Sequence, residues 1–238
     1  GYMSQRNRYF LVGAVLVLSA GLCTGLVAYY NGSLPLGTAS MGPAELAYLP
    51  AETTAVAYAN VSEIMNSEFR QKIRQVLPTG EEKDKLLAEI GLDIEHDIDS
   101  VVAGVTGTEP TLAGALVLVR GRINTVQIEA QAVQHGAKTE EYKGKHMILA
   151  GEAHDVPSIG GTGTTPVAQS FTGAVAFLEP GLIALGDAAA IRRGIDASIS
   201  HEDATKNADL MKFVVEAASG SNAWAVGRFD GTSNASAL

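Results

Sequence analysis

The densest set of side chains that could bind a metal or move a proton is Glu95, His96, Asp97 and Asp99. Metal sites usually draw their ligands from separate elements or from one face of a helix. This set instead sits in a linker between a charged helical pattern and an apolar strand pattern. We therefore interpret it as an exposed capping turn and expect no metal there.

Two further stretches resemble ligand sites. His154 and Asp155 lie in a predicted loop that has no second histidine at ligand spacing, so we expect no metal role for them. Residues 160–163, Gly-Gly-Thr-Gly, resemble a phosphate cradle. A Walker motif needs a Lys-Ser/Thr pair at a helix start, and a dinucleotide fingerprint needs a strand before the glycines and a helix after them. Pro166 and then a strand follow here, which predicts a flexible loop.

Nucleophilic chemistry has little support in the sequence. There is no G-x-S-x-G elbow, and the sole cysteine, Cys23, lies inside a long apolar run. Trp224 shares a predicted strand with small apolar residues, which predicts a core position rather than a ligand platform. These patterns predict a protein that is not an enzyme and that has no cofactor.

The element that places the rest of the chain is the uncharged apolar run from Tyr9 to Tyr30. As a helix it reaches about 33 Å, enough to cross a hydrocarbon core of roughly 30 Å. A cleaved secretory signal has a shorter apolar region. The stretch before Cys23 resembles a lipoprotein box but has Leu22 where a small residue is needed. We therefore predict a retained transmembrane helix over 9–30.

The charges that flank this run predict its orientation. Arg6 and Arg8 precede it, whereas the next positive charge on the other side is Arg70. By the positive-inside rule, residues 1–8 stay in the cytoplasm and the remainder is exported. We expect a single-pass protein of a bacterial inner membrane with a periplasmic C-terminal domain.

Small residues form a short patch on the predicted span. Gly21 and Gly25 make a G-x-x-x-G pair, and Gly13 lies on the same face although Val17 interrupts the row. Such patches allow close packing of two transmembrane helices. Gly13, Gly21 and Gly25 are therefore our candidate helix-packing residues.

The composition of the exported part limits its partners. Residues 31–238 carry 15 basic and 26 acidic residues, a net charge of −11. This charge should repel nucleic acid and anionic lipid head groups. Because the exported part has no cysteine, it cannot form a disulfide, and its fold must depend on packing.

Local patterns divide the exported part into a flexible tether, 31–47, and one domain, 48–238. Ser62 is a plausible N-cap, and Lys143-Gly144 and Glu179-Pro180-Gly181 are hairpin turns. The predicted strands are 54–60, 101–105, 112–119, 138–142, 146–149, 174–178, 182–185 and 223–229, and the predicted helices are 62–76, 81–90, 124–134, 188–199 and 208–218.

This order of elements predicts an α+β fold, a mostly antiparallel sheet covered by helices. A strand, a short polar turn and a helix recur at 55–64, 116–128 and 182–195. A fourth copy starts at Ala223, which suggests a duplicated strand-helix unit. Because this copy stops where its helix should begin, we expect the chain to continue past Leu238.

Several segments together resemble a family of bacterial single-span, membrane-anchored extracytoplasmic proteins that contain a domain of unknown function. These segments are YLPAETTAVAYANV, DIEHDIDSVVAGVTG, GALVLVRGRI, EEYKG, AFLEPGLIALGD and NAWAVGRF. They are structural rather than catalytic motifs and bring no functional residues with them. The resemblance implies an extracytoplasmic, membrane-anchored location and the fold class, and it implies no activity.

The anchor, the acidic domain and the missing site motifs favour a non-enzymatic accessory or structural subunit. Its partners would be other membrane protein subunits, contacted through the span and the acidic domain, together with the lipid bilayer. A respiratory or photosynthetic electron-transfer assembly and an envelope scaffold remain alternative hosts. The alternative function is a carrier or sensor that holds an apolar ligand between sheet and helices.

Overall fold

A computed structural model of the chain describes residues 42–67, 93–107, 114–134, 136–150, 154–155, 170–171 and 173–227. Among these residues no helix is both long and apolar enough to cross a membrane. The predicted span, 9–30, lies outside the described residues and stays a prediction. The same holds for the predicted helix over 81–90 and for the glycine-rich stretch over 160–163.

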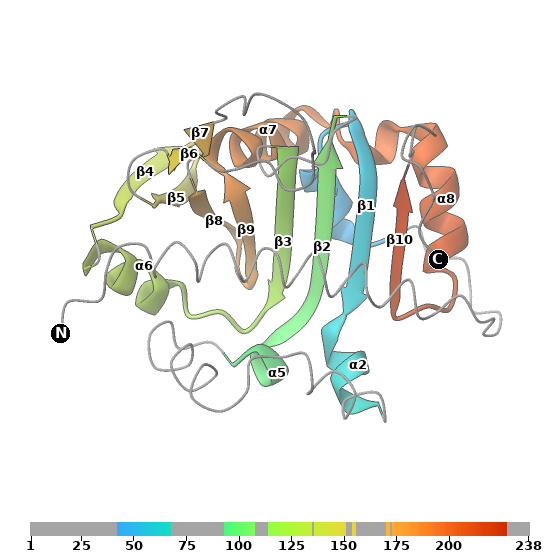
Figure 1. Cartoon of the computed structure of the whole chain (residues 1–238), viewed down its shortest axis with the longest axis horizontal. Helices are drawn as coiled ribbons and strands as arrows, with labels where there is room; N and C mark the ends of the chain where they lie inside the picture. The colour runs from blue at the N-terminus through green and yellow to red at the C-terminus, as the bar shows by residue number, and fades with distance from the viewer. Residues whose placement is uncertain are drawn as a thin grey trace.

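The fold is α+β and is built on an eight-stranded sheet in which every pair of neighbours is antiparallel (Figure 1), as the order of elements predicts. The strands follow one another in the order β10-β1-β2-β3-β9-β8-β5-β4. Their bounds are β1 (Thr53–Asn60), β2 (Ile98–Thr106), β3 (Ala115–Gly121), β4 (Lys138–Tyr142), β5 (Lys145–Leu149), β8 (Gly173–Glu179), β9 (Leu182–Asp187) and β10 (Ala223–Gly227).

Both predicted hairpin turns are confirmed. Lys143 and Gly144 join β4 to β5 with φ angles of 49° and 77°, the left-handed conformation that a two-residue hairpin turn needs. Gly181, with a φ of 77°, completes the turn between β8 and β9. A separate two-stranded ribbon pairs β6 (His154–Asp155) with β7 (Ser170–Phe171).

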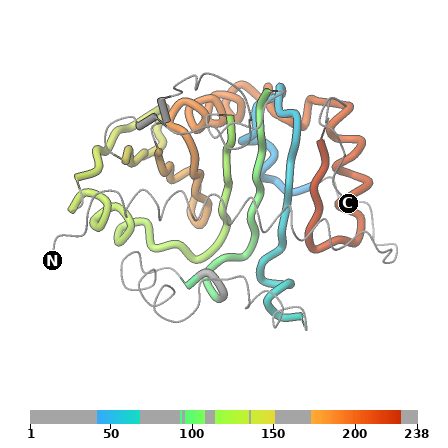
Figure 2. The backbone as a smooth tube through the Cα atoms, in the orientation of Figure 1, coloured from blue at the N-terminus to red at the C-terminus, as the bar shows by residue number. Residues whose placement is uncertain are grey.

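One face of the sheet packs against α7 (Ala188–Ser200), α8 (Ala208–Ala218) and the short 3-10 helices η1 (Ala44–Tyr48) and η3 (Ala204–Lys206). Both long helices present apolar residues at helical spacing to this face, Ile191 and Ile195 from α7 and Leu210 and Val214 from α8. Figure 2 shows the chain passing from β9 through α7, η3 and α8 to β10 at the sheet edge.

The opposite face of the sheet is also apolar. Its core cluster joins Val101, Val117, Val119 and Ile183 from the strands to the short helix α2 (Val61–Asn66). Two more helices, α5 (Ile94–Asp97) and α6 (Thr125–Gln134), lead into β2 and out of β3. Because both faces are apolar, the central strands lack the clear alternation of a half-exposed sheet.

The helix predicted over 62–76 differs from the structure at both ends. Asn60 is the N-cap of α2, because its side chain accepts a hydrogen bond of 3.1 Å from the backbone N–H of Glu63. Ser62 lies inside the helix and its hydroxyl donates to Asn60. The helix ends at Asn66, where Ser67 turns extended and its hydroxyl bonds the carbonyl of Ile64. Residues 68–76 lie outside the described part.

The structure also places the domain boundary earlier than the sequence does. The predicted tether ran to residue 47, but η1 begins at Ala44 and its Glu45 and Leu46 are 5% and 0% exposed. The Gly, Ser and Pro content that favoured a tether stops before these residues. Leu46 belongs to the main core cluster, so the packed domain begins at η1.

Candidate functional site

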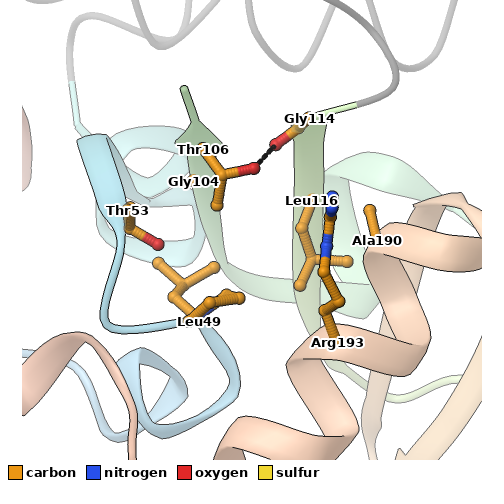
Figure 3. Close-up of a pocket in the computed structure, with 9 residues that line it drawn as sticks. Leu49, Thr53, Gly104, Thr106, Gly114, Leu116, Ala190 and Arg193 are labelled. Atoms are coloured by element: carbon orange, nitrogen blue, oxygen red, sulfur yellow. Dashed lines mark hydrogen bonds between the residues drawn. The ribbon is translucent and has the colours of Figure 1, made fainter. Parts of the chain in front are cut away.

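A small pocket lies where β1, β2, β3 and α7 meet (Figure 3). Leu49 and Leu116 form its apolar wall, and Arg193 extends alongside from α7. Gly104 is needed there because a Cβ atom at this position would lie 2.6 Å from a methyl carbon of Leu49. The sheet can therefore approach the segment before β1 closely at this point.

The polar groups of this pocket suit a water molecule. The buried hydroxyl of Thr53 has no hydrogen-bond partner among the described residues, whereas the Thr106 hydroxyl donates 3.2 Å to the carbonyl of Gly114. The pocket has room for about one water. Such a water would satisfy Thr53, and the space is too small for a substrate or a lipid chain.

A second polar cluster joins η1 to the middle of the sheet. The Arg120 guanidinium on β3 donates to the carboxylate of Glu45, whose side chain is 6% exposed, and lies 3.7 Å from the carboxylate of Glu179. The Tyr48 hydroxyl donates 2.9 Å to the other oxygen of Glu179. We call Glu45, Tyr48, Arg120 and Glu179 the junction cluster.

Burial and charge shift the pKa values in the junction cluster. Burial, then the hydrogen bond and the charge of Glu179, raise the pKa of Tyr48 to about 12. The hydrogen bond to Glu45 raises the pKa of Arg120 above its ordinary value. The phenol and the guanidinium therefore keep their protons at neutral pH. In these protonation states both groups donate hydrogen bonds to the carboxylates, which holds η1 on the sheet.

The pKa of Tyr48 predicts a loss of stability in alkali. The unfolded chain releases the Tyr48 proton near pH 10 and the folded chain only near pH 12, so this group's contribution is complete below pH 10 and falls between pH 10 and 12. We expect the urea midpoint of Tyr48→Phe to fall less between pH 9.5 and 11.5 than that of the unmodified chain. Equal falls would contradict the prediction.

Another polar cluster ties the β4–β5 hairpin to α7. The Tyr142 hydroxyl lies 3.1 Å from both oxygens of Asp196, and the Lys143 ammonium lies 2.6 Å from one of them. The hydrogen bond from Lys143 lowers the pKa of Asp196. Beside them, Arg192 pairs with Glu140. All these groups are partly exposed, so they attach the hairpin to the helix and do not form a cleft.

The first group of candidate metal ligands lies at α5 and the start of β2. Asp97, the last residue of α5, accepts a hydrogen bond from the backbone N–H of Asp93, and exposed His96 pairs with Asp93 at 3.0 Å, so a short helix stands where the sequence predicts a linker. The side chains of Glu95, His154 and Asp155 lie outside the described part. Within that part no group of three or more acidic, histidine or cysteine side chains could hold a metal. Gly13, Gly21 and Gly25 lie beyond it too.

Trp224 is a core residue, as predicted. It is 4% exposed and stacks on Tyr58 with ring centroids 5.6 Å apart. The junction cluster, in contrast, was missed by sequence reasoning. Glu45 and Arg120 are 75 residues apart and Tyr48 and Glu179 are 131 apart, so no local spacing connects them.

Comparison with known proteins adds little to this geometry. The chain matches no model of a protein family and no curated protein. Among solved structures it resembles one described as crystal form III of TP0453, with 9% identity and a TM-score of 0.41. The match covers 71% of this chain and 53% of that chain, so the chain spans about half the length of that protein. The resemblance to a family of membrane-anchored bacterial proteins remains an expectation from sequence motifs.

Proposed function

We propose that this protein is a non-enzymatic, single-span accessory subunit whose exported domain binds or braces a bacterial membrane protein complex. The apolar run over 9–30 supplies the anchor, and the net charge of −11 over residues 31–238 gives an acidic docking surface. A respiratory or photosynthetic electron-transfer assembly is one possible host.

The observation that carries this proposal is how the chain enters the domain. η1, the first described element after the predicted span, is held to β3 by the Glu45–Arg120 pair and to β8 by Tyr48 and Glu179. Leu46 and Leu49 are fully buried on either side of Tyr48. A force on the anchor is therefore passed to the sheet, which suits a brace.

The pocket of Figure 3 does not favour the alternative of an apolar-ligand carrier. Ligand pockets usually enclose several hundred cubic ångströms. This pocket lies between sheet and helix, where such a ligand was expected, and has room for about one water.

The proposal is tested by isolating the full chain from native membranes in mild detergent. We expect other membrane proteins to co-elute with it at a fixed stoichiometry in size-exclusion chromatography. A matched chain whose residues 9–30 are replaced by an unrelated apolar helix should keep the partners held by the domain and lose those held by the span. Elution of the chain without any other protein, whether as one copy or as several, would overturn the proposal.

Duplication of a strand-helix unit is also part of the proposal. β1 runs into α2, β3 into α6 and β9 into α7, at the three places where the sequence pattern recurs. Such a recurrence can arise when a small unit is copied within one chain.

A further inference from the structure

The two edge strands of the eight-stranded sheet differ in the side chains that would hinder pairing with a further strand. β4, at one end, has charges at Lys138, Glu140 and Glu141, three of its five residues. β10, at the other end, reads Ala-Trp-Ala-Val-Gly, with no charge and no proline. Charged side chains and prolines are the usual protection of an exposed edge against another strand. Of the two edges of the eight-stranded sheet, β10 is therefore the one without charged side chains or proline.

The backbone of β10 presents hydrogen-bonding groups to that edge. The Asn60 N–H donates 2.7 Å to the carbonyl of Asn222, so residue 222 bonds toward β1. Successive residues of a strand turn their polar groups to opposite sides. Ala223, Ala225 and Gly227 therefore direct their N–H and C=O groups outward, where no described strand receives them.

The helix beside this edge also exposes apolar side chains. α8 packs on β10 and joins Trp224 in the main core through Leu210 and Val214. Its Phe213 and Val215 are nevertheless 47% and 36% exposed. An uncharged strand edge next to exposed aromatic and aliphatic side chains has the composition of an interface core.

We propose that a second copy of this chain pairs with β10 across a two-fold axis, forming one continuous sheet. The axis would pass beside Ala225, which would exchange N–H and C=O hydrogen bonds with its own copy, and Ala223 would face Gly227. A strand related to itself by a two-fold axis is antiparallel, as this sheet requires. Five paired residues bury less than the roughly 1,000 Å² of a stable interface, so α8 contributes to the contact.

The charge of the chain does not oppose a second copy along the strand of this edge. Two exported parts of net charge −11 repel each other at most orientations, but β10 brings no like charges together. The predicted span supplies another self-contact through Gly21 and Gly25, since G-x-x-x-G patches pack two such helices closely. The inference does not depend on the proposed accessory function, because it concerns contact between copies.

Disulfide trapping in the full chain tests this pairing. In a Cys23→Ala background, Ala225→Cys would face its own copy at the roughly 5.5 Å between Cα atoms that a disulfide accepts. Ala57→Cys is the matched control, because Ala57 is the partner of Ala225 on β1 and would lie two strands further from its copy. After mild oxidation in membranes we expect at least about tenfold more covalent dimer from Ala225→Cys than from Ala57→Cys.

A second variant tests the pairing without a disulfide. Ala225→Pro removes an outward N–H and leaves the bonds to β1 intact, since proline is tolerated where an edge N–H points away from the sheet. We expect native mass spectrometry to show a several-fold lower dimer fraction with unchanged circular dichroism. Equal trapping at positions 225 and 57 would overturn the inference. So would an Ala225→Cys chain that stays monomeric because its own C-terminal residues cover β10.

Discussion

Replacing Arg120 with methionine is expected to lower the free energy of unfolding by about 3 kcal/mol, since removing one partner of a buried ion pair leaves the other charge uncompensated. Glu45 is the charge left behind, and its side chain is 6% exposed. Arg120 itself is 34% exposed, so water entering its space limits the loss to the lower end of the usual range. Urea unfolding of the full chain in detergent, followed by circular dichroism, measures the change.

Two matched variants separate the buried charge from the loss of packing. Glu45→Met combined with Arg120→Met removes both charges, which is often close to neutral, so the double variant should recover at least about 2 kcal/mol. Arg192→Met removes an arginine from a pair with Glu140 that is about one third exposed on both sides, and should cost less than about 1 kcal/mol. An Arg120→Met chain as stable as Arg192→Met would contradict the role given to the junction cluster.

Sequence patterns predicted most of the sheet because its signals are local. Lys143-Gly144 and Gly181 can adopt the positive φ angles that hairpin turns require, and they fix which strands are neighbours. The apolar spacing of Ile191 and Ile195 identifies the covering helix α7 in the same way. The N-cap was predicted at the wrong residue, because Asn60 and Ser62 are both good N-caps and the extended backbone at the end of β1 places Asn60 at the helix start.

Contacts between distant residues could not be predicted in this way. Glu45 is a solvent-compatible residue in a run without periodicity, and its burial depends on Arg120, which comes 75 residues later. The hydrogen bond that the Tyr48 hydroxyl donates likewise needs Glu179, which comes 131 residues later. The outward direction of the Ala225 backbone likewise follows from its register against Ala57, which no composition rule provides. The junction cluster and the open edge therefore required the structure.

The second large effect is expected at Leu46, the residue that most clearly separates a tether from a packed domain. Leu46→Ala should lower the free energy of unfolding by about 2–5 kcal/mol, because the side chain is fully buried and the cavity cannot collapse completely. η1 is held there by the junction cluster, and its neighbourhood is already tight. A Cβ atom at Gly42, for example, would lie 2.9 Å from both Leu46 and Val214.

Val126→Ala is the matched control for this truncation. Val126 lies on α6 and is 76% exposed, so shortening it should change the free energy of unfolding by less than about 0.5 kcal/mol. Unfolding of both variants is compared with that of the unmodified chain in the same detergent. If Leu46→Ala is as mild as Val126→Ala, then η1 does not pack on the sheet, and the chain enters its domain through a loose tether. A large difference instead means that the packed domain begins at η1, which Leu46 and the junction cluster together hold on the sheet.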